Sequence, residues 1–330
     1  MISCTEFIPA YSELFKFIDR RSGRQAVYDY WDYLFDPASS PLNGYLVRYG
    51  LKGCWEYWKV IFSEEACDGA VLFNESEGWY ADCMHFCPSK GRFEKLGYME
   101  PFDEYCLHCN GYDWSLNRHN LVHLVDYRGT EKASCREIIY DPNVFKLDAQ
   151  KLIDEMYACE MRGCTLAEGK CPLLRPGTET LITSPKTLKY LHREFHVSMD
   201  RGADYVRKQY GEDGLSEYLS QFEHAFHIPL REAIKKEGLT AIGAYLTQLY
   251  AIEEASDALG IKETENELLV TVRYCPAVRY MKNENHIPSD AYEKCTEYVY
   301  RALAEETGYG FEMLSYDAAN GAAEYRFFVK

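Results

Sequence analysis

Short motifs in the first half of the chain recur in the second half at a nearly constant spacing. The spacing is 188 or 189 residues over about a hundred positions, which unrelated segments would not share by chance. The matched motifs are Pro41-Leu42 with Pro229-Leu230, Gly50-Leu51 with Gly238-Leu239, Glu64-Glu65-Ala66 with Glu253-Glu254-Ala255, Cys87-Pro88 with Cys275-Pro276, Cys106 with Cys295, and Tyr127 with Tyr316. We therefore expect a tandem duplication of one folding unit.

Each copy shows the same order of helical and extended patterns. Apolar residues recur at helical spacing in two segments, and two hairpins follow, joined by a helical connection. The helical segments are 26–35, 45–67, 202–227 and 230–259, the hairpins are 70–86, 121–140, 258–274 and 311–329, and the connections are 91–117 and 289–307. Each unit is predicted to be ααββαββ, an α+β fold with helices on a four-stranded antiparallel sheet. A pseudo-twofold axis would relate the two units.

The duplication also predicts where the chain divides. Residues 1–147 would form the first repeat, 148–186 a linker that contains cysteine and proline, and 187–330 a divergent second repeat. The linker carries three cysteines whose spacing matches no standard zinc or iron–sulfur motif, so metal ligation there stays an open alternative to a simple excursion. These cysteines are Cys159, Cys164 and Cys171.

The formal net charge of −16 limits the partners of this chain of 330 residues. Nucleic acids and anionic membranes are bound through basic faces, so neither is expected. No apolar run approaches the roughly 20 residues of a membrane span, and Met1–Phe17 has no signal-peptide pattern. We expect a cytoplasmic protein that acts on a small molecule, with a second copy of itself as a candidate partner.

Cysteine is concentrated in the first copy and the linker: eleven of the 13 cysteines lie between Cys4 and Cys171, eight of them in the first copy. Without an export signal, they are expected to be free thiols or metal ligands. Cys83, His85 and Cys87 alternate along one predicted strand and would share a face of the sheet. The other members are Cys106, His108, Cys109 and Asp113 in the connection, His119 and His123 near the third strand, and Cys135 at the start of the fourth.

This set allows two kinds of chemistry. Thiolates and imidazoles bind zinc or ferrous iron, with His85, Cys87, Cys106 and Cys109 as the candidate ligands. A cysteine thiolate with a histidine base is the alternative, as in acyl transfer. His119 and His123 are instead expected to be surface or packing residues.

The second copy replaces most of this set. Cys87 and Cys106 align with cysteines and could serve the scaffold alone, whereas the histidines have no histidine counterparts. The polar residues on matching positions of the second copy predict a charged pocket wall or a domain interface rather than a catalytic centre. They are Arg273, Glu312, Glu324 and Arg326.

The first copy resembles the L-2-amino-thiazoline-4-carboxylic acid hydrolase family. The resemblance covers roughly residues 45–140 and extends weakly to 225–329. It rests on Cys87-Pro88 after a strand, Leu96-Gly97, the stretch from Cys106 to Asp113, and Cys135 in a closing strand. Here the spacing from Cys109 to Asp113 is wider than the family pattern.

The resemblance implies hydrolytic opening of a small cyclic amidine or thiazoline ring at a non-peptide C–N bond. The implied catalytic residues are Cys87, Cys106, His108 and Asp113, acting through a thiolate or through water on zinc or Fe(II). Arg92, Arg136 or Arg273 would hold a substrate carboxylate. A small-ligand- or metal-binding module without catalysis is the alternative function.

Overall fold

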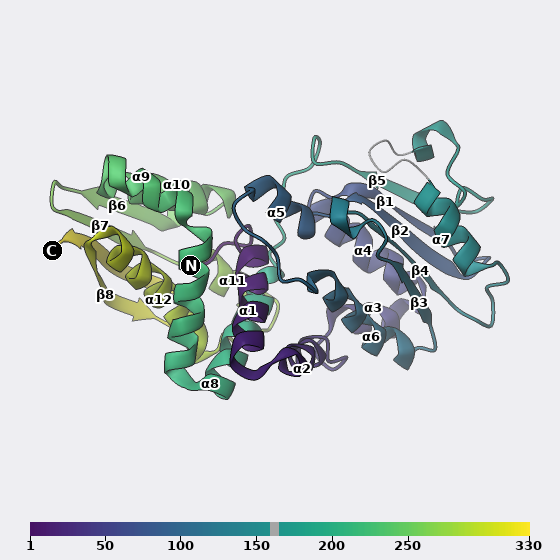
Figure 1. Cartoon of the computed structure of the whole chain (residues 1–330), viewed down its shortest axis with the longest axis horizontal. Helices are drawn as coiled ribbons and strands as arrows, with labels where there is room; N and C mark the ends of the chain where they lie inside the picture. The colour runs from purple at the N-terminus through teal and green to yellow at the C-terminus, as the bar shows by residue number, and fades with distance from the viewer. Residues whose placement is uncertain (159–164) are drawn as a thin grey trace. The chain divides into compact units, whose positions relative to one another are not determined.

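The computed structural model describes residues 1–158 and 165–330 (Figure 1). The chain divides into two compact units. The central unit is Arg24–Tyr190, and the terminal unit combines Met1–Gly23 with Leu191–Lys330. The second boundary lies close to residue 187, where the second repeat was predicted to begin. Among the described residues, no helix is long and apolar enough to span a membrane.

The first helix of the chain belongs to the terminal unit. Helix α1 (Phe7–Ser22) packs against α8 (Phe195–Phe226) and is buried along most of its length. The Tyr218 hydroxyl of α8 donates a hydrogen bond of 3.0 Å to the Ala10 carbonyl, which fixes the two helices side by side. The matched sequence motifs begin at Pro41, after this helix, so they did not indicate the unit to which it belongs.

The central unit is a sheet between two helical layers. Its five antiparallel strands are ordered β3-β4-β2-β1-β5. The strands are β1 (Asp68–Asn74), β2 (Trp79–Phe86), β3 (Val122–Asp126), β4 (Cys135–Tyr140) and β5 (Glu179–Thr183). The α-helices are α2 (Arg24–Leu34), α3 (Pro41–Tyr49), α4 (Lys52–Glu64), α5 (Lys90–Leu96), α6 (Asp113–Arg118) and α7 (Ala149–Ala158), and the 3₁₀-helices are η1 (Tyr105–Tyr112), η2 (Thr130–Lys132) and η3 (Thr165–Glu168).

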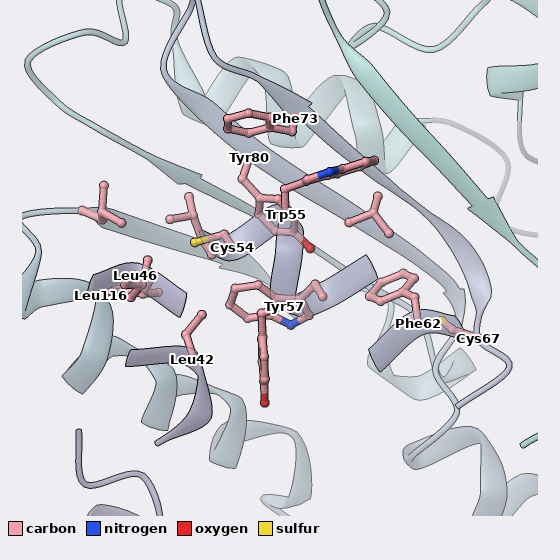
Figure 2. Packing of buried hydrophobic residues seen from close by; sticks show 14 residues of the cluster. Leu42, Leu46, Cys54, Trp55, Tyr57, Phe62, Cys67, Phe73, Tyr80 and Leu116 are labelled. Atoms are coloured by element: carbon pink, nitrogen blue, oxygen red, sulfur yellow. The ribbon is translucent and has the colours of Figure 1, made fainter. Parts of the chain in front are cut away.

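Helices cover both faces of the central sheet. Trp55, Trp58 and Phe62 of α4 pack on Phe73 and Tyr80, and Figure 2 shows the labelled members of this cluster. Helix α7 packs its apolar side on the opposite face through a second cluster. Two apolar faces on one sheet explain why β1 is buried at nearly every residue rather than at alternate residues.

The segment 148–186, expected to be a linker, contributes α7 and β5. Strand β5 pairs with β1 in antiparallel register from Glu179 to Thr183, which makes the central sheet five-stranded instead of four-stranded. The Asn74 side chain donates hydrogen bonds to the Pro176 carbonyl and the Thr178 hydroxyl, holding the chain that leads into β5. The prolines that suggested an excursion lie outside both elements.

The terminal unit has the predicted four-stranded antiparallel sheet, ordered β6-β7-β9-β8. Its strands are β6 (Leu259–Glu263), β7 (Glu267–Val272), β8 (Tyr309–Asp317) and β9 (Ala322–Val329). Its remaining helices are α9 (Ile228–Glu237), α10 (Leu239–Ile252), the short η4 (Ser256–Ala258), α11 (Pro276–Asn283) and α12 (Asp290–Thr307). Both units therefore mix helices with antiparallel sheets, and the α+β class is confirmed.

The two sheets share strand order and several backbone details. β1, β2, β3 and β4 occupy the places that β6, β7, β8 and β9 occupy in the other sheet. Gly50 and Gly238 both adopt positive φ and divide a predicted long helix into two. The amide of Cys87 donates to the Ala133 carbonyl, and that of Cys275 donates to the Asn320 carbonyl, in the corresponding hairpin turns.

Candidate functional site

A row of polar side chains crosses the α4-covered face of the central sheet. Asp82 on β2 lies directly opposite Glu137 on β4, and both are buried. On β3, His123 places Nε2 3.0 Å from Glu137 Oε2 and Nδ1 2.7 Å from Asp113 Oδ1. The Tyr80 hydroxyl donates a hydrogen bond of 2.8 Å to Asp82 Oδ2. We call these five residues the buried polar network.

The two buried carboxyl groups of the network differ in protonation state. Burial, reinforced by the charge of Glu137, raises the pKa of Asp82 well above its usual range. Burial also opposes ionisation of Glu137, but the hydrogen bond to His123, the charge of His123 and a smaller contribution from Asp82 together outweigh burial and lower the Glu137 pKa. Asp82 Oδ1 and Glu137 Oε1 have no hydrogen-bond partner within the described residues. A proton held on Asp82 and shared with Glu137 would satisfy both oxygens.

His123 is the cation of this network. Burial disfavours its charge, but hydrogen bonds to Asp113 and Glu137 prevail and raise the pKa of His123 to about 9. The Asp113 side chain is 44% exposed, while the His123 side chain is 3% exposed. The network therefore leads from solvent at Asp113 to the fully buried Asp82.

Four cysteines lie at the end of the central sheet next to this network. They are Cys87, Cys106, Cys109 and Cys135, which we call the thiol cluster. Burial raises the pKa of all four thiols, to about 12 for Cys87. Cys87 also raises the pKa of Cys109 and Cys135, and so do Asp82 and Glu137. The cluster and the network are thus electrostatic neighbours, and the thiols are neutral at pH 7.

His108 and Cys109 form a thiol–imidazole pair in η1. His108 Nδ1 donates to the Tyr105 carbonyl, so Nε2 carries the lone pair. That Nε2 lies 3.8 Å from Cys109 Sγ. Burial lowers the pKa of His108 to about 4, with the Tyr105 carbonyl partly opposing the shift, so the ring is neutral at pH 7 and its Nε2 faces the thiol as an acceptor.

The other residues expected to share the strand face with Cys87 lie elsewhere. Cys83 packs into the apolar cluster under α7, on the opposite face from Met84. His85 Nδ1 is 3.7 Å from Asp68 Oδ1, and burial lowers the pKa of His85 although Asp68 partly offsets it. Cys87 follows the last residue of β2, where the strand alternation ends. The structure therefore groups Cys87 with the thiol cluster and not with His85.

The three candidate arginines for a substrate carboxylate are separated. Arg136 is buried on the α7 side, where its Nε donates to the Met156 carbonyl at 2.8 Å. Arg92 lies 4.3 Å from the centre of the Tyr190 ring. Arg273 belongs to the terminal unit and lines a pocket there. None of the three is in the thiol cluster.

The terminal sheet carries apolar or aromatic residues where the central sheet carries its polar network. Strand order and register define the corresponding positions. The pairs are Tyr80 with Leu268, Asp82 with Val270, His123 with Phe311, Glu137 with Tyr325, and Cys135 with Ala323. The backbone arrangement thus forms without buried charge, so the network is a specific property of the central unit.

Comparison with known proteins adds no family: no family model, curated protein or solved structure matches the chain. Within the ranges 1–158 and 165–330, no three His, Cys, Asp or Glu side chains are grouped as a metal site. Cys159 and Cys164 lie outside the described residues.

The pattern of cysteines and histidines in the sequence does not indicate the acidic half of the site. Asp82 and Glu137 sit inside predicted strands, and a charged residue in a two-sided buried strand is a signal that could have marked them. The sequence predicts His123 at the surface or in packing, and Asp113 as a base or orienting group. Their mutual contact depends on α6 meeting β3, which sequence spacing alone does not indicate.

Proposed function

We propose that the central unit is a hydrolase that opens a small cyclic amidine or thiazoline-type ring, with Cys109 as nucleophile and His108 as base. The observation that carries this proposal is the 3.8 Å approach of His108 Nε2 to Cys109 Sγ, with Nδ1 held by the Tyr105 carbonyl. The resemblance to the L-2-amino-thiazoline-4-carboxylic acid hydrolase family supports the same reaction class. Its motif residues Cys87 and Cys135 belong to the surrounding thiol cluster.

The reaction follows from this pair. His108 takes the thiol proton as Cys109 sulfur bonds to the ring carbon, and the C=N electron pair moves to nitrogen. The carbon–heteroatom bond of the ring then breaks, and the leaving atom takes the proton from His108. Water next attacks the same carbon and displaces the Cys109 sulfur. A proton of this water passes through His108 to the leaving thiolate, so the thiol is restored and one water is consumed for each ring opened.

The buried polar network would support this chemistry from behind the thiols. Glu137 and Asp82 place one buried negative charge beside Cys109, which keeps the thiol protonated until a substrate is bound. A cationic amidine would offset that charge, because it brings an opposite charge close to Glu137. Substrate binding and activation of Cys109 are thereby linked.

Replacing Cys109 tests the proposal. Turnover of a 2-amino-thiazoline carboxylate by Cys109→Ala is expected to fall by at least about a thousandfold. Cys83→Ala is the matched control, because Cys83 lies on the opposite face of the sheet, and it should retain most of the activity. Wild-type turnover by Cys109→Ala would show that this thiol is not the nucleophile.

We infer that the two units arose by tandem duplication. The common strand order, the positive φ of Gly50 and Gly238, and the shared amide contacts of Cys87 and Cys275 support this origin. The residues of the buried polar network then belong to the catalytic copy, and the terminal copy is non-catalytic. An experimental structure in which the two sheets fail to superpose strand for strand would contradict the inference.

A soft metal ion in the thiol cluster is the second candidate function. It is supported by the proximity of Cys87, Cys109 and Cys135: ionisation of one thiol opposes ionisation of the next, and a bound cation would instead favour the thiolate forms. Elemental analysis of protein purified without oxygen and without a metal-affinity tag tests it. Stoichiometric zinc or iron in the wild type that is absent from Cys135→Ser would favour metal-activated water. An active protein without metal would favour the thiol of Cys109 as the nucleophile.

A further inference from the structure

A pocket in the terminal unit is lined by cationic side chains. Its volume is about 350 Å³, and Arg273, Arg279 and Lys282 contribute to its walls with Asn283 and Asn320. This volume is at the lower end of the range for small-molecule sites. The pocket lies within the terminal unit, so its role is independent of the hydrolase proposed for the central unit.

The pocket walls come from three segments that the backbone holds together. Arg273 follows β7, Arg279 and Lys282 are on α11, and Asn320 is in the turn between β8 and β9. The Cys275 amide donates a hydrogen bond of 2.9 Å to the Asn320 carbonyl, which joins the start of α11 to that turn.

Gly321 allows this close approach. Its φ is +70°, and a Cβ there would lie 2.4 Å from the Cβ of Cys275. Lys282 Nζ donates to the Ala318 carbonyl from the other side of the turn. The arrangement is therefore fixed by backbone contacts and does not depend on surface side chains alone.

The cationic groups of the pocket have no acidic partner. Arg273 donates to the Asp257 backbone carbonyl, and Arg279 stacks on Tyr274 with its Cζ 3.4 Å from the ring centre. Neither arginine, nor Lys282, forms an ion pair with a carboxylate among the described residues. In contrast, Arg326 of the same unit binds both Glu267 and Glu312.

Three cationic side chains that lack a carboxylate partner are unexpected in this chain, because its 52 acidic residues outnumber its 36 basic residues. A stacked guanidinium keeps its edge free for two parallel hydrogen bonds to an oxyanion. Asn283 and Asn320 add amide groups at the same pocket. We propose that this pocket binds a small molecule through a phosphate or carboxylate group, with Arg279 as the principal contact.

Calorimetric titration of the full chain with inorganic phosphate, and separately with citrate, tests this site. Arg279→Gln is expected to weaken binding by about tenfold or more, because a charge-assisted contact is lost. Arg326→Gln removes the same charge from the same unit at a paired arginine, and it should bind as the wild type does. Whichever anion binds more tightly identifies phosphate or carboxylate as the recognised group.

Two outcomes would overturn the proposal. One is the absence of binding by either anion at millimolar concentration. The other is equal weakening in Arg279→Gln and Arg326→Gln, which would indicate a general effect of net charge. Both substitutions change exposed side chains outside the thiol cluster, so loss of hydrolase activity is not expected in either variant, and the two proposals can fail separately.

Discussion

The central and terminal units place opposite chemistry on the same sheet positions. The central sheet buries two carboxyl groups and an imidazolium under α4, whereas the terminal sheet has apolar and aromatic residues at the corresponding positions. Buried ion pairs are weak contributors to stability, because desolvation offsets their attraction. The comparison teaches that the scaffold does not need the buried polar network, which makes function the better explanation for its presence.

Breaking the network at one residue should have the largest effect. Glu137→Leu leaves the buried His123 cation without its interior partner and is expected to cost about 3–5 kcal/mol of unfolding free energy. The triple variant Asp82→Val, His123→Phe, Glu137→Tyr copies the terminal sheet and should recover about 2 kcal/mol or more of that loss. Urea unfolding measures both variants. A triple variant less stable than Glu137→Leu would contradict the interchangeability of the two cores.

The two units should respond to pH in opposite directions. The His123 pKa of about 9 lies above its ordinary 6.5, so its stabilisation of the central unit is complete below pH 6.5 and is lost as pH rises through about 9. In the terminal unit, burial opposes ionisation of Glu253, but His196 prevails and lowers the Glu253 pKa to about 2. That stabilisation is present above about pH 4.5 and is lost as pH falls toward 2.

Fluorescence can separate these two responses, because all five tryptophans lie in the central unit. Tryptophan emission should report alkaline loss of stability, and His123→Phe should remove that pH dependence. Circular dichroism of the whole chain should show the acid-sensitive change, which Glu253→Gln should reduce. Alkaline destabilisation of equal size in His123→Phe would argue against this assignment.

Hairpin turns at corresponding positions should differ in their tolerance of a side chain. Gly321→Ala is expected to destabilise the terminal unit by about 1–3 kcal/mol, because the new Cβ adopts positive φ and meets Cys275. Thermal unfolding measures the loss. An unchanged midpoint would mean that the turn relaxes and that the pocket wall is less fixed than its contacts indicate.

The reverse substitution in the central unit should have the smallest effect. Ala133 occupies the corresponding turn with φ +49°, where a side chain is already accommodated. Ala133→Gly should change unfolding free energy by less than about 1 kcal/mol, because relief of the positive φ is offset by greater freedom of the unfolded chain. A loss as large as that in Gly321→Ala would remove the distinction between the turns.

The elements that recur in the sequence repeat could be predicted from it, whereas the elements outside the repeat could not. The paired hairpins and the four-stranded order of the terminal sheet follow from alternation and from the repeat. Helix α7 and strand β5 have no repeated counterpart, and β5 depends on pairing with a strand more than a hundred residues earlier. Local pattern carries no information on such long-range pairing.

The candidate site was predictable only in its cysteines and histidines. Cys106, His108 and Cys109 are close in sequence, so their proximity on η1 required no tertiary information. Asp82 and Glu137 meet through the register of β2 with β4, which is set by the whole sheet. The separation of His85 from Cys87 likewise depends on where β2 ends, and boundaries of elements are poorly encoded by local pattern.

Strand β5 also affects the tendency of the protein to aggregate. Its partner β1 contains the uncharged run Gly69 to Phe73, and an open edge with this composition would recruit strands from other molecules. The corresponding strand β6 ends in Lys262 and Glu263 and lies at an edge of its sheet, where charge discourages such pairing. By pairing with β1, a segment outside the repeat shields this uncharged edge from strands of other molecules.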